Sequence, residues 1–281
     1  MIVINQFVKA GYDATVFSDT LYELQHWFPH IKISKVPKDE KTFLGCLQTF
    51  DQLILFHHEV KHFSPSFIPL LKKNPIIFEK FKQFYADNIP IASIHKNILE
   101  NYFDFKHVSI DNGLIPPSQL THRKFKNRVV MHVTAGESHR AYLPKRFIKL
   151  ADKLKTQGFD CYFIVAPFEY KHWVWVKKQG IKLPQFSSLD KMASFIYESG
   201  YFIGNDSGLG HLASNLGIST LSLFIRSKLY KRWRPIWGLN LSIIAPPILV
   251  LISLKMKYWK YLIPWQQVYF KFRKLLNHDR N

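Results

Sequence analysis

In the first third of the chain, short apolar runs alternate with segments whose apolar residues recur at helical spacing. Strands are predicted at residues 14–17, 31–36 and 52–56, and helices at residues 2–10, 21–27 and 67–86. Gly11 is a natural stop for the first helix, and Pro69 and Pro75 divide the third. Strands that alternate with helices in this way predict a parallel sheet of the α/β class.

A strand, a glycine turn and a helix start follow one another at residues 201–217. The apolar run 201–203 stops at Gly204, a polar turn follows, and a helical pattern then leads to a second apolar run at 219–224. A helix that starts after such a turn attracts anions through its free amides and its dipole. The pattern therefore predicts a site for a phosphate-bearing ligand between two parallel strands.

Four residues of this turn are candidates for ligand binding. Asp206 and Ser207 have side-chain oxygens that can cap the helix, and Gly208 has no side chain to keep a ligand away from the backbone. His211 lies one turn into the helix, where its ring could bond a phosphate oxygen. The structural alternatives are a plain helix cap for Asp206 and a buried core histidine for His211.

Residues 235–254 carry no charge, and their length is close to that of a segment that spans a bilayer. Asn240 and the pair Pro246-Pro247 interrupt this segment, and prolines at mid-span would leave backbone groups unpaired in lipid. A strand at 241–244 is therefore predicted instead of a membrane helix. Further on, residues 265–276 place their apolar side chains on one face, which predicts a helix packed against the core.

The composition allows two medium-sized domains. The chain has 281 residues, of which 47% are hydrophobic and 16% aromatic, enough for a substantial core. Cys46 and Cys161 lie far apart in the sequence, so we expect neither a disulfide framework nor a zinc site, and a reducing compartment. The apolar start, residues 1–6, is too short for a signal peptide, and a cytoplasmic location is expected.

The charge of the chain is strongly basic and gathers toward its C-terminal part. The formal net charge is +19, and residues 225–281 hold twelve Lys or Arg against one acid, Asp279, a net charge of +11. Such a surface suits an anionic membrane, a phosphorylated acceptor or nucleic acid, or is simply a solvated basic face. Four tryptophans interleaved with these charges favour the membrane–water interface: Trp233, Trp237, Trp259 and Trp265. No nucleic-acid-binding module is visible, and no nucleic acid partner is expected.

The glycine turn and its two strands resemble the signature of family 9 glycosyltransferases, the heptosyltransferase-like enzymes of lipopolysaccharide assembly. The matching positions are Asp206, Ser207, Gly208, His211, Leu212, Ala213, Leu216, Gly217, Leu223 and Phe224. The resemblance implies an α/β fold with two Rossmann-like domains of the GT-B type. We expect an acceptor-side domain at residues 1–125 and a donor domain at 126–281, with the polar, basic segment 118–128 as the linker.

The resemblance also implies the reaction and the partners. The expected activity is inverting, metal-independent transfer of a sugar from a nucleotide-diphosphate sugar to a lipopolysaccharide core or related glycolipid, without a cofactor. The implied donor is ADP-heptose, and heptose is the sugar that it would supply. Other nucleotide sugars remain open, because Ile225 stands where the family usually places glycine. The implied location is the cytoplasmic face of the membrane, where the basic C-terminal region would dock.

Four further residues are assigned to the donor site through the resemblance. Residues 129–135 resemble the first strand of the donor domain, which contains Thr134, and Arg140 follows at the family's basic position. Glu169 stands after the next strand, where the family often carries the glutamate that holds the ribose. Phe186 belongs to a segment that resembles the one packed on the base.

The resemblance is weakest at the start of the chain. Family members open with a strand and a Gly-Asp loop whose aspartate is the usual candidate base, whereas residues 11–17 resemble the family's second strand. We therefore expect an incomplete N-terminal domain. Asp13 and Asp19 are weak candidates for the base, and so is Glu59, which follows two histidines at 57–58. Neighbouring residues of a strand point to opposite faces, so these histidines are not expected to hold a metal.

An incomplete N-terminal domain leaves alternatives to an active enzyme. One is a catalytically inactive, nucleotide-sugar-binding remnant of the family. A less favoured alternative is a basic protein that binds nucleic acid, for which the net charge of +19 is the only support.

Overall fold

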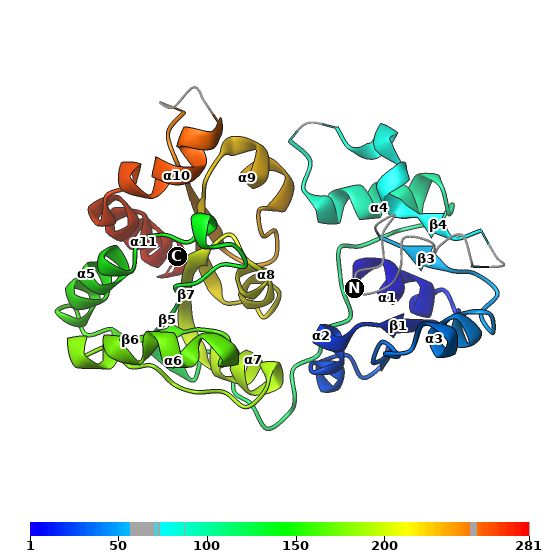
Figure 1. The fold of residues 1–281 in the computed structure, drawn as a ribbon, viewed down its shortest axis with the longest axis horizontal. Coiled ribbons are helices and arrows are strands. Elements are labelled where there is room, and N and C mark those ends of the chain that lie inside the picture. The colour runs from blue at the N-terminus through cyan, green and yellow to red at the C-terminus, as the bar shows by residue number, and fades with distance from the viewer. Residues whose placement is uncertain (57–70, 72–73, 87, 248–251, 281) are drawn as a thin grey trace. The chain divides into compact units, whose positions relative to one another are not determined.

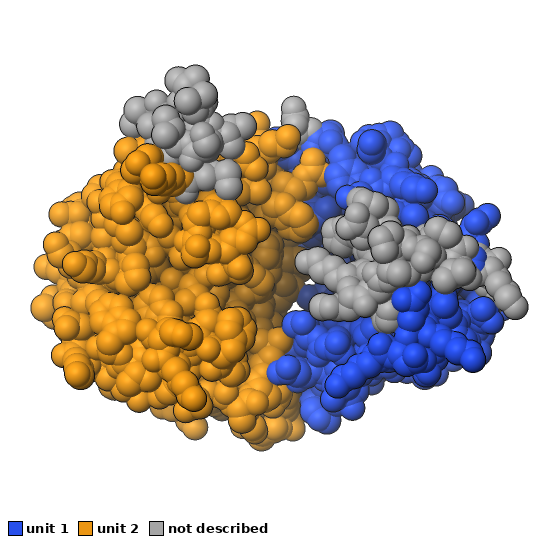
Figure 2. All heavy atoms as spheres, in the orientation of Figure 1, with its two compact units in different colours: residues 1–115 blue, residues 116–281 orange. Residues whose placement is uncertain are grey.

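The computed structural model describes residues 1–56, 71, 74–86, 88–247 and 252–280. The described residues form two compact units, residues 1–115 and 116–281 (Figure 2). Both units are built from strands and helices that alternate along the chain, which confirms the α/β class (Figure 1). The division into functional domains at 125/126 remains a prediction.

The first unit contains two small parallel pairs of strands. β1 (Thr15–Phe17) pairs with β2 (Lys32–Ser34), and β3 (Ile54–Leu55) pairs with β4 (Ile76–Ile77). Its helices are α1 (Ile2–Lys9), α2 (Asp19–Tyr22), α3 (Glu40–Leu47) and α4 (Ile91–Asn101). The strands predicted at 14–17, 31–36 and 52–56 are therefore confirmed, and so is the first helix, which ends just before Gly11 at a φ of +87°.

One helix of the first unit was predicted wrongly. Of the segment 67–86, the described part contains β4 and two short 3-10 turns, Phe78–Lys80 and Lys82–Phe84. Pro75 prevents a continuous helix, and the two β-branched residues after it pair with β3 instead. The predicted helix 21–27 is also interrupted, since α2 ends at Tyr22 and a 3-10 turn covers Gln25–Trp27.

The second unit is a five-stranded parallel sheet with the strand order β6-β5-β7-β8-β9 (Figure 1). Its strands are β5 (Phe125–His132), β6 (Asp160–Ile164), β7 (Ser199–Asn205), β8 (Ser219–Phe224) and β9 (Asn240–Ile244). The strands expected at 201–203, 219–224 and 241–244 are confirmed. β5 begins inside the predicted linker 118–128 and ends at His132, so Thr134 lies just beyond the strand rather than within it.

Helices cover both faces of this sheet. The main ones are α5 (Pro144–Lys155), α7 (Leu189–Tyr197), α8 (Gly208–Asn215) and α11 (Trp265–Arg280). α5 and α11 pack against Ile203 and its neighbours, whereas α8 lies against Phe202, which points to the opposite face. Because both faces are covered, every residue of β7 and β8 is buried, including the polar Thr220 and Ser222 of β8.

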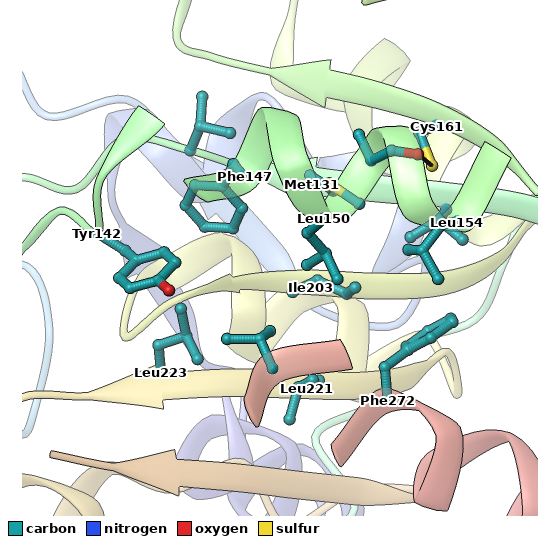
Figure 3. Packing of buried hydrophobic residues seen from close by; sticks show 14 of the residues in the cluster. Met131, Tyr142, Phe147, Leu150, Leu154, Cys161, Ile203, Leu221, Leu223 and Phe272 are labelled. Carbon is teal, nitrogen blue, oxygen red and sulfur yellow. Dashed lines mark hydrogen bonds between the residues drawn. The ribbon is translucent and has the colours of Figure 1, made fainter. Parts of the chain in front are cut away.

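Figure 3 shows the core between the sheet and its helices. Met131, Ile203 and Leu221 come from three neighbouring strands, and Phe147 of α5 and Phe272 of α11 pack against them. The apolar face predicted at 265–276 is confirmed, since its residues belong to this core.

The tryptophans of the basic C-terminal region do not form one exposed belt. Trp233 of α9 (Ser227–Trp233) is 40% exposed, but Trp259 of α10 (Ile252–Leu262) is fully buried and donates a hydrogen bond to the His139 carbonyl. Trp265 packs against the core. No helix among the described residues has the length and apolar character needed to cross a bilayer.

Candidate functional site

The predicted polar residues meet where the carboxyl ends of β5, β6 and β7 reach the same edge of the sheet. His132 ends β5, and Thr134 and Arg140 lie in the segment between β5 and α5. Glu169 follows β6, and Asp206 follows β7. In an open parallel sheet this edge is the usual place for a ligand.

Three of these side chains, together with that of Ser207, form a continuous chain of hydrogen bonds. The Thr134 hydroxyl donates to Glu169 Oε2 at 2.9 Å, and its oxygen also lies 3.1 Å from Nε2 of His132. On the other side of the ring, His132 Nδ1 lies 3.0 Å from the Ser207 hydroxyl. Glu169 is further held by the Ala166 amide, which donates to the same Oε2 at 3.0 Å. The chain therefore links the ends of three strands.

His132 is buried, and a glycine on the neighbouring strand makes room for it. Burial lowers the pKa of the imidazole from 6.5 to about 4, so the ring is neutral at neutral pH. Gly204 is its register partner on β7. A Cβ atom at Gly204 would lie 2.8 Å from the Phe202 ring and 3.3 Å from His132 Cβ. Sequence analysis did not select His132, although a histidine that ends a buried apolar run was a usable signal.

Asp206 and Arg140 form an ion pair beside this chain, with 2.5 Å between Asp206 Oδ2 and an Arg140 terminal nitrogen. The Asp206 side chain is 8% exposed and that of Arg140 is 31% exposed. Burial raises the pKa of Asp206, and the nearby charge of Arg140 opposes this rise. A guanidinium has five N–H donors, and the Arg140 side chain is partly exposed, so it keeps donor capacity for a ligand beside its bond to Asp206.

Asn205 fixes the loops that carry these groups. Its side-chain nitrogen Nδ2 donates to the Thr134 backbone carbonyl at 3.1 Å, and its side-chain oxygen Oδ1 accepts from the Tyr142 backbone amide at 2.9 Å. Asn205 is fully buried, so these bonds hold the segment from Thr134 to Tyr142 in place. Sequence analysis missed this residue as well, although a buried asparagine at the end of an apolar strand was the available signal.

The start of α8 differs in one respect from the prediction. Ser207 occupies the N-cap position, but its side chain makes no cap hydrogen bond because the hydroxyl contacts His132 instead. Asp206 does not cap the helix either and pairs with Arg140. Gly208 is exposed, and a Cβ atom there would meet nothing within 4 Å, so the first turn of α8 is open to a ligand.

His211 is half-buried at the side of α8. Burial lowers its pKa, while the charge of Asp206 and a hydrogen bond with the Trp233 carbonyl act in the opposite direction. One ring nitrogen is therefore engaged with the backbone. Whether the other contacts a phosphate remains a prediction.

The remaining predicted residues lie outside this hydrogen-bonded group. Phe186 packs on Phe195 of α7, with 5.4 Å between the ring centroids. In the first unit, Asp13 is 77% exposed and pairs with Lys32 at 2.7 Å, and Asp19 accepts a hydrogen bond from the Val36 amide. The candidates at positions 57–59 fall outside the described residues. In the part of the chain that is described, no three His, Cys, Asp or Glu side chains could together hold a metal ion.

A parallel sheet with a helix start, an arginine and fixed hydroxyls at one edge is the arrangement with which open α/β proteins bind phosphate-bearing ligands. The family model "Glycosyltransferase family 9 (heptosyltransferase)" matches residues 39–245, which include every residue of this site. The chain therefore belongs to glycosyltransferase family 9. A search of curated proteins finds no match.

Solved structures of this family share the fold. A family 9 glycosyltransferase from Veillonella parvula has a TM-score of 0.71 at 17% identity, over 99% of this chain and 94% of that one. The ADP-heptose lipopolysaccharide heptosyltransferase II of E. coli has a TM-score of 0.69 at 13% identity, over 100% and 95%. The E. coli heptosyltransferase WaaC with ADP has a TM-score of 0.68 at 12% identity, over 98% and 94%. These similarities confirm a fold of the GT-B type.

Proposed function

We propose that the protein is an inverting, metal-independent glycosyltransferase that moves heptose from ADP-heptose to a lipopolysaccharide core or a related glycolipid. The observation that carries this proposal is the ion pair of Arg140 and Asp206 beside the open start of α8, in a chain that belongs to family 9. Solved relatives were studied with ADP and with ADP-2-deoxy-2-fluoro heptose, which supports this donor.

The second unit would bind the donor along its sheet edge. Arg140 and the amides at Gly208 would hold the diphosphate, since both donate hydrogen bonds to anionic oxygens. The hydrogen bonds that hold Glu169 fall on Oε2, so Oε1 would be available to the ribose hydroxyls. His211 would contact the diphosphate from α8, and Phe186 would contact the base.

In the reaction, an acceptor hydroxyl would attack the anomeric carbon from the side opposite the diphosphate. The bond between that carbon and the diphosphate oxygen would break, and ADP would leave with the bonding electrons. The positive charge of Arg140 and the α8 amides would stabilise the developing charge on ADP, a task that needs no metal. The proton of the acceptor hydroxyl would pass to a base, for which Asp13 is the candidate in the first unit.

The acceptor and the membrane would be bound through basic and aromatic surface residues. Tyr258 and Tyr261 of α10 are 41% and 55% exposed, and Trp233 of α9 is exposed near several cationic side chains. Aromatic rings beside cations favour the interface of an anionic membrane. This supports a peripheral position on an anionic membrane, and the cytoplasmic face is the one that the family resemblance implies.

Calorimetric titration with ADP-heptose, with UDP and GDP sugars as comparators, tests the donor. Binding of ADP-heptose that Asp206→Asn weakens and Asp152→Asn leaves intact would support the proposal, since Asp152 forms only an exposed pair with Lys155. Transfer would then be followed as ADP release with a glycolipid acceptor, with and without a chelator. NMR of the product would show whether the anomeric configuration inverts.

The alternative is a family member that binds a nucleotide sugar without transferring it. It is favoured by the surroundings of Asp13, because an exposed carboxylate paired with Lys32 is a poor base. Saturable donor binding without ADP release, under every acceptor tried, would decide for this alternative. Absence of binding by the folded protein would contradict both.

A further inference from the structure

The hydrogen-bonded chain from Glu169 to Ser207 admits one arrangement of protons. Thr134 has a single hydroxyl proton, and it points to Glu169 Oε2, an acceptor that also receives the Ala166 amide. The Thr134 oxygen can therefore only accept from the histidine ring, 3.1 Å away. It follows that Nε2 of His132 carries a proton.

The same logic continues through the ring to Ser207. The imidazole is buried and neutral, because burial lowers its pKa to about 4, and a neutral imidazole carries only one N–H. With the proton on Nε2, Nδ1 is an acceptor, and the Ser207 hydroxyl 3.0 Å away must donate to it. The only proton of Ser207 is thus turned into the protein.

We propose that His132 is a positioning residue that makes Ser207 a pure hydrogen-bond acceptor toward the ligand, so that Ser207 receives a hydroxyl of the donor sugar rather than contacting a diphosphate oxygen. This inference rests on the proposed donor site and goes beyond it, because it assigns the sugar-recognising atom and the residue that sets its polarity. His132 itself does not contact the ligand.

The polarity of the neighbouring groups supports this division. Phosphate oxygens carry no proton at neutral pH, so they repel an oxygen that can only accept. Donors for the diphosphate are present in the partly exposed Arg140, which pairs with the preceding residue Asp206, and in the amides at the exposed Gly208. Sugar hydroxyls are donors as well as acceptors, and they satisfy a serine oxygen that has no proton to offer.

Nitrogen NMR of the ligand-free protein tests the role of His132 directly. With ¹⁵N-labelled histidine, Nε2 of His132 should show the shift of a protonated ring nitrogen and Nδ1 that of an unprotonated one. Thr134→Ser, which keeps the hydroxyl, should preserve this pattern, and Thr134→Val should lose it. Protonation of Nδ1 in the wild type would overturn the proposal, even if the variants do not fold.

Binding measurements test what Ser207 recognises. Ser207→Ala should weaken ADP-heptose by about three- to tenfold, the effect of one hydrogen bond, and leave ADP unchanged. Asp152→Asn, which breaks only an exposed ion pair on α5, should bind both as the wild type does. Equal weakening of ADP and ADP-heptose by Ser207→Ala would show a phosphate contact and overturn the inference. If the folded wild type binds neither ligand, the proposed donor site fails, whereas the NMR result still decides the role of His132.

Discussion

Arg123 and Asp279 form a two-pronged ion pair that joins the segment before β5 to the last turn of α11. Both terminal nitrogens of Arg123 donate to the Asp279 carboxylate, at 2.8 and 2.5 Å. Asp279 also accepts from the hydroxyls of Tyr201 on β7 and Ser219 on β8. One carboxylate thus connects α11 with the amino ends of two central strands, at the opposite edge from the candidate site.

Asp279→Asn should lower the free energy of unfolding by about 1.5–3 kcal/mol, the range for a charge-assisted hydrogen bond. The pair is shielded, since the side chains of Arg123 and Asp279 are only 23% and 11% exposed. Urea unfolding followed by tryptophan fluorescence measures this change, because every tryptophan except Trp27 lies in residues 116–281. Asp152→Asn, which breaks an exposed pair, should change little. An equal effect of the two variants would show that the ion pair adds nothing.

Asp279 should also make the second unit sensitive to acid. Burial raises the pKa of its carboxyl, but the hydrogen bonds from Arg123 and Ser219 and the charge of Arg123 outweigh burial, and the pKa lies below 3.8. A pKa lower in the folded than in the unfolded state contributes stability above the unfolded value, which is lost as pH falls through the folded value. Stability should therefore fall below pH 3.8 in the wild type and less in Asp279→Asn. Urea midpoints on both sides of that pH would show it, and parallel curves would contradict it.

Two glycines of the site should respond differently to the same substitution. Gly204→Ala should destabilise the protein by about 1–3 kcal/mol, because the added methyl group overlaps the Phe202 ring and crowds His132. Gly208→Ala has open space and should leave the unfolding midpoint unchanged, yet weaken ADP-heptose where the ligand approaches the α8 backbone. Unfolding and calorimetry on both variants separate the two effects. A Gly208→Ala variant with unaltered affinity would place the ligand away from this turn.

Arg140→Met should weaken ADP and ADP-heptose alike, by about tenfold or more, because the cation and its donors are lost together. Lys145→Met, which removes an exposed cation at the start of α5, is the matched control and should not alter the affinity. Calorimetry at low and high salt adds a second readout, since the wild type should lose more affinity with salt than Arg140→Met does. The same salt dependence in both proteins would mean that Arg140 does not face the diphosphate.

Sequence analysis was most successful for elements whose own run of apolar residues shows which side chains are buried. The buried run at 219–224 is β8, and the apolar face at 265–276 is the buried face of α11. The segment 67–86 was mistaken for a helix because its apolar residues suit either structure, and the pairing of β4 with β3 is a contact distant in sequence.

The same distinction applies to the site. Thr134, Arg140, Glu169, Asp206 and Ser207 were selected from motifs, and the structure brings them to one edge of the sheet. The partners within that group could not be predicted, because the bond from Ser207 to His132 joins residues 75 positions apart. A pattern along the chain indicates which residue types are present, but the direction of each hydroxyl depends on neighbours from other strands.

The ion pair of Arg123 and Asp279 has a consequence for how the protein is made. Tyr201 and Ser219 find their acceptor only on a residue that the ribosome adds 60 positions or more after them. While residue 279 is still inside the exit tunnel, the amino ends of the central strands lack the Asp279 carboxylate. The end of α11, whose Phe272 belongs to the core, cannot yet be packed in full against the sheet. The second unit can therefore complete its folding only once residue 279 has left the tunnel.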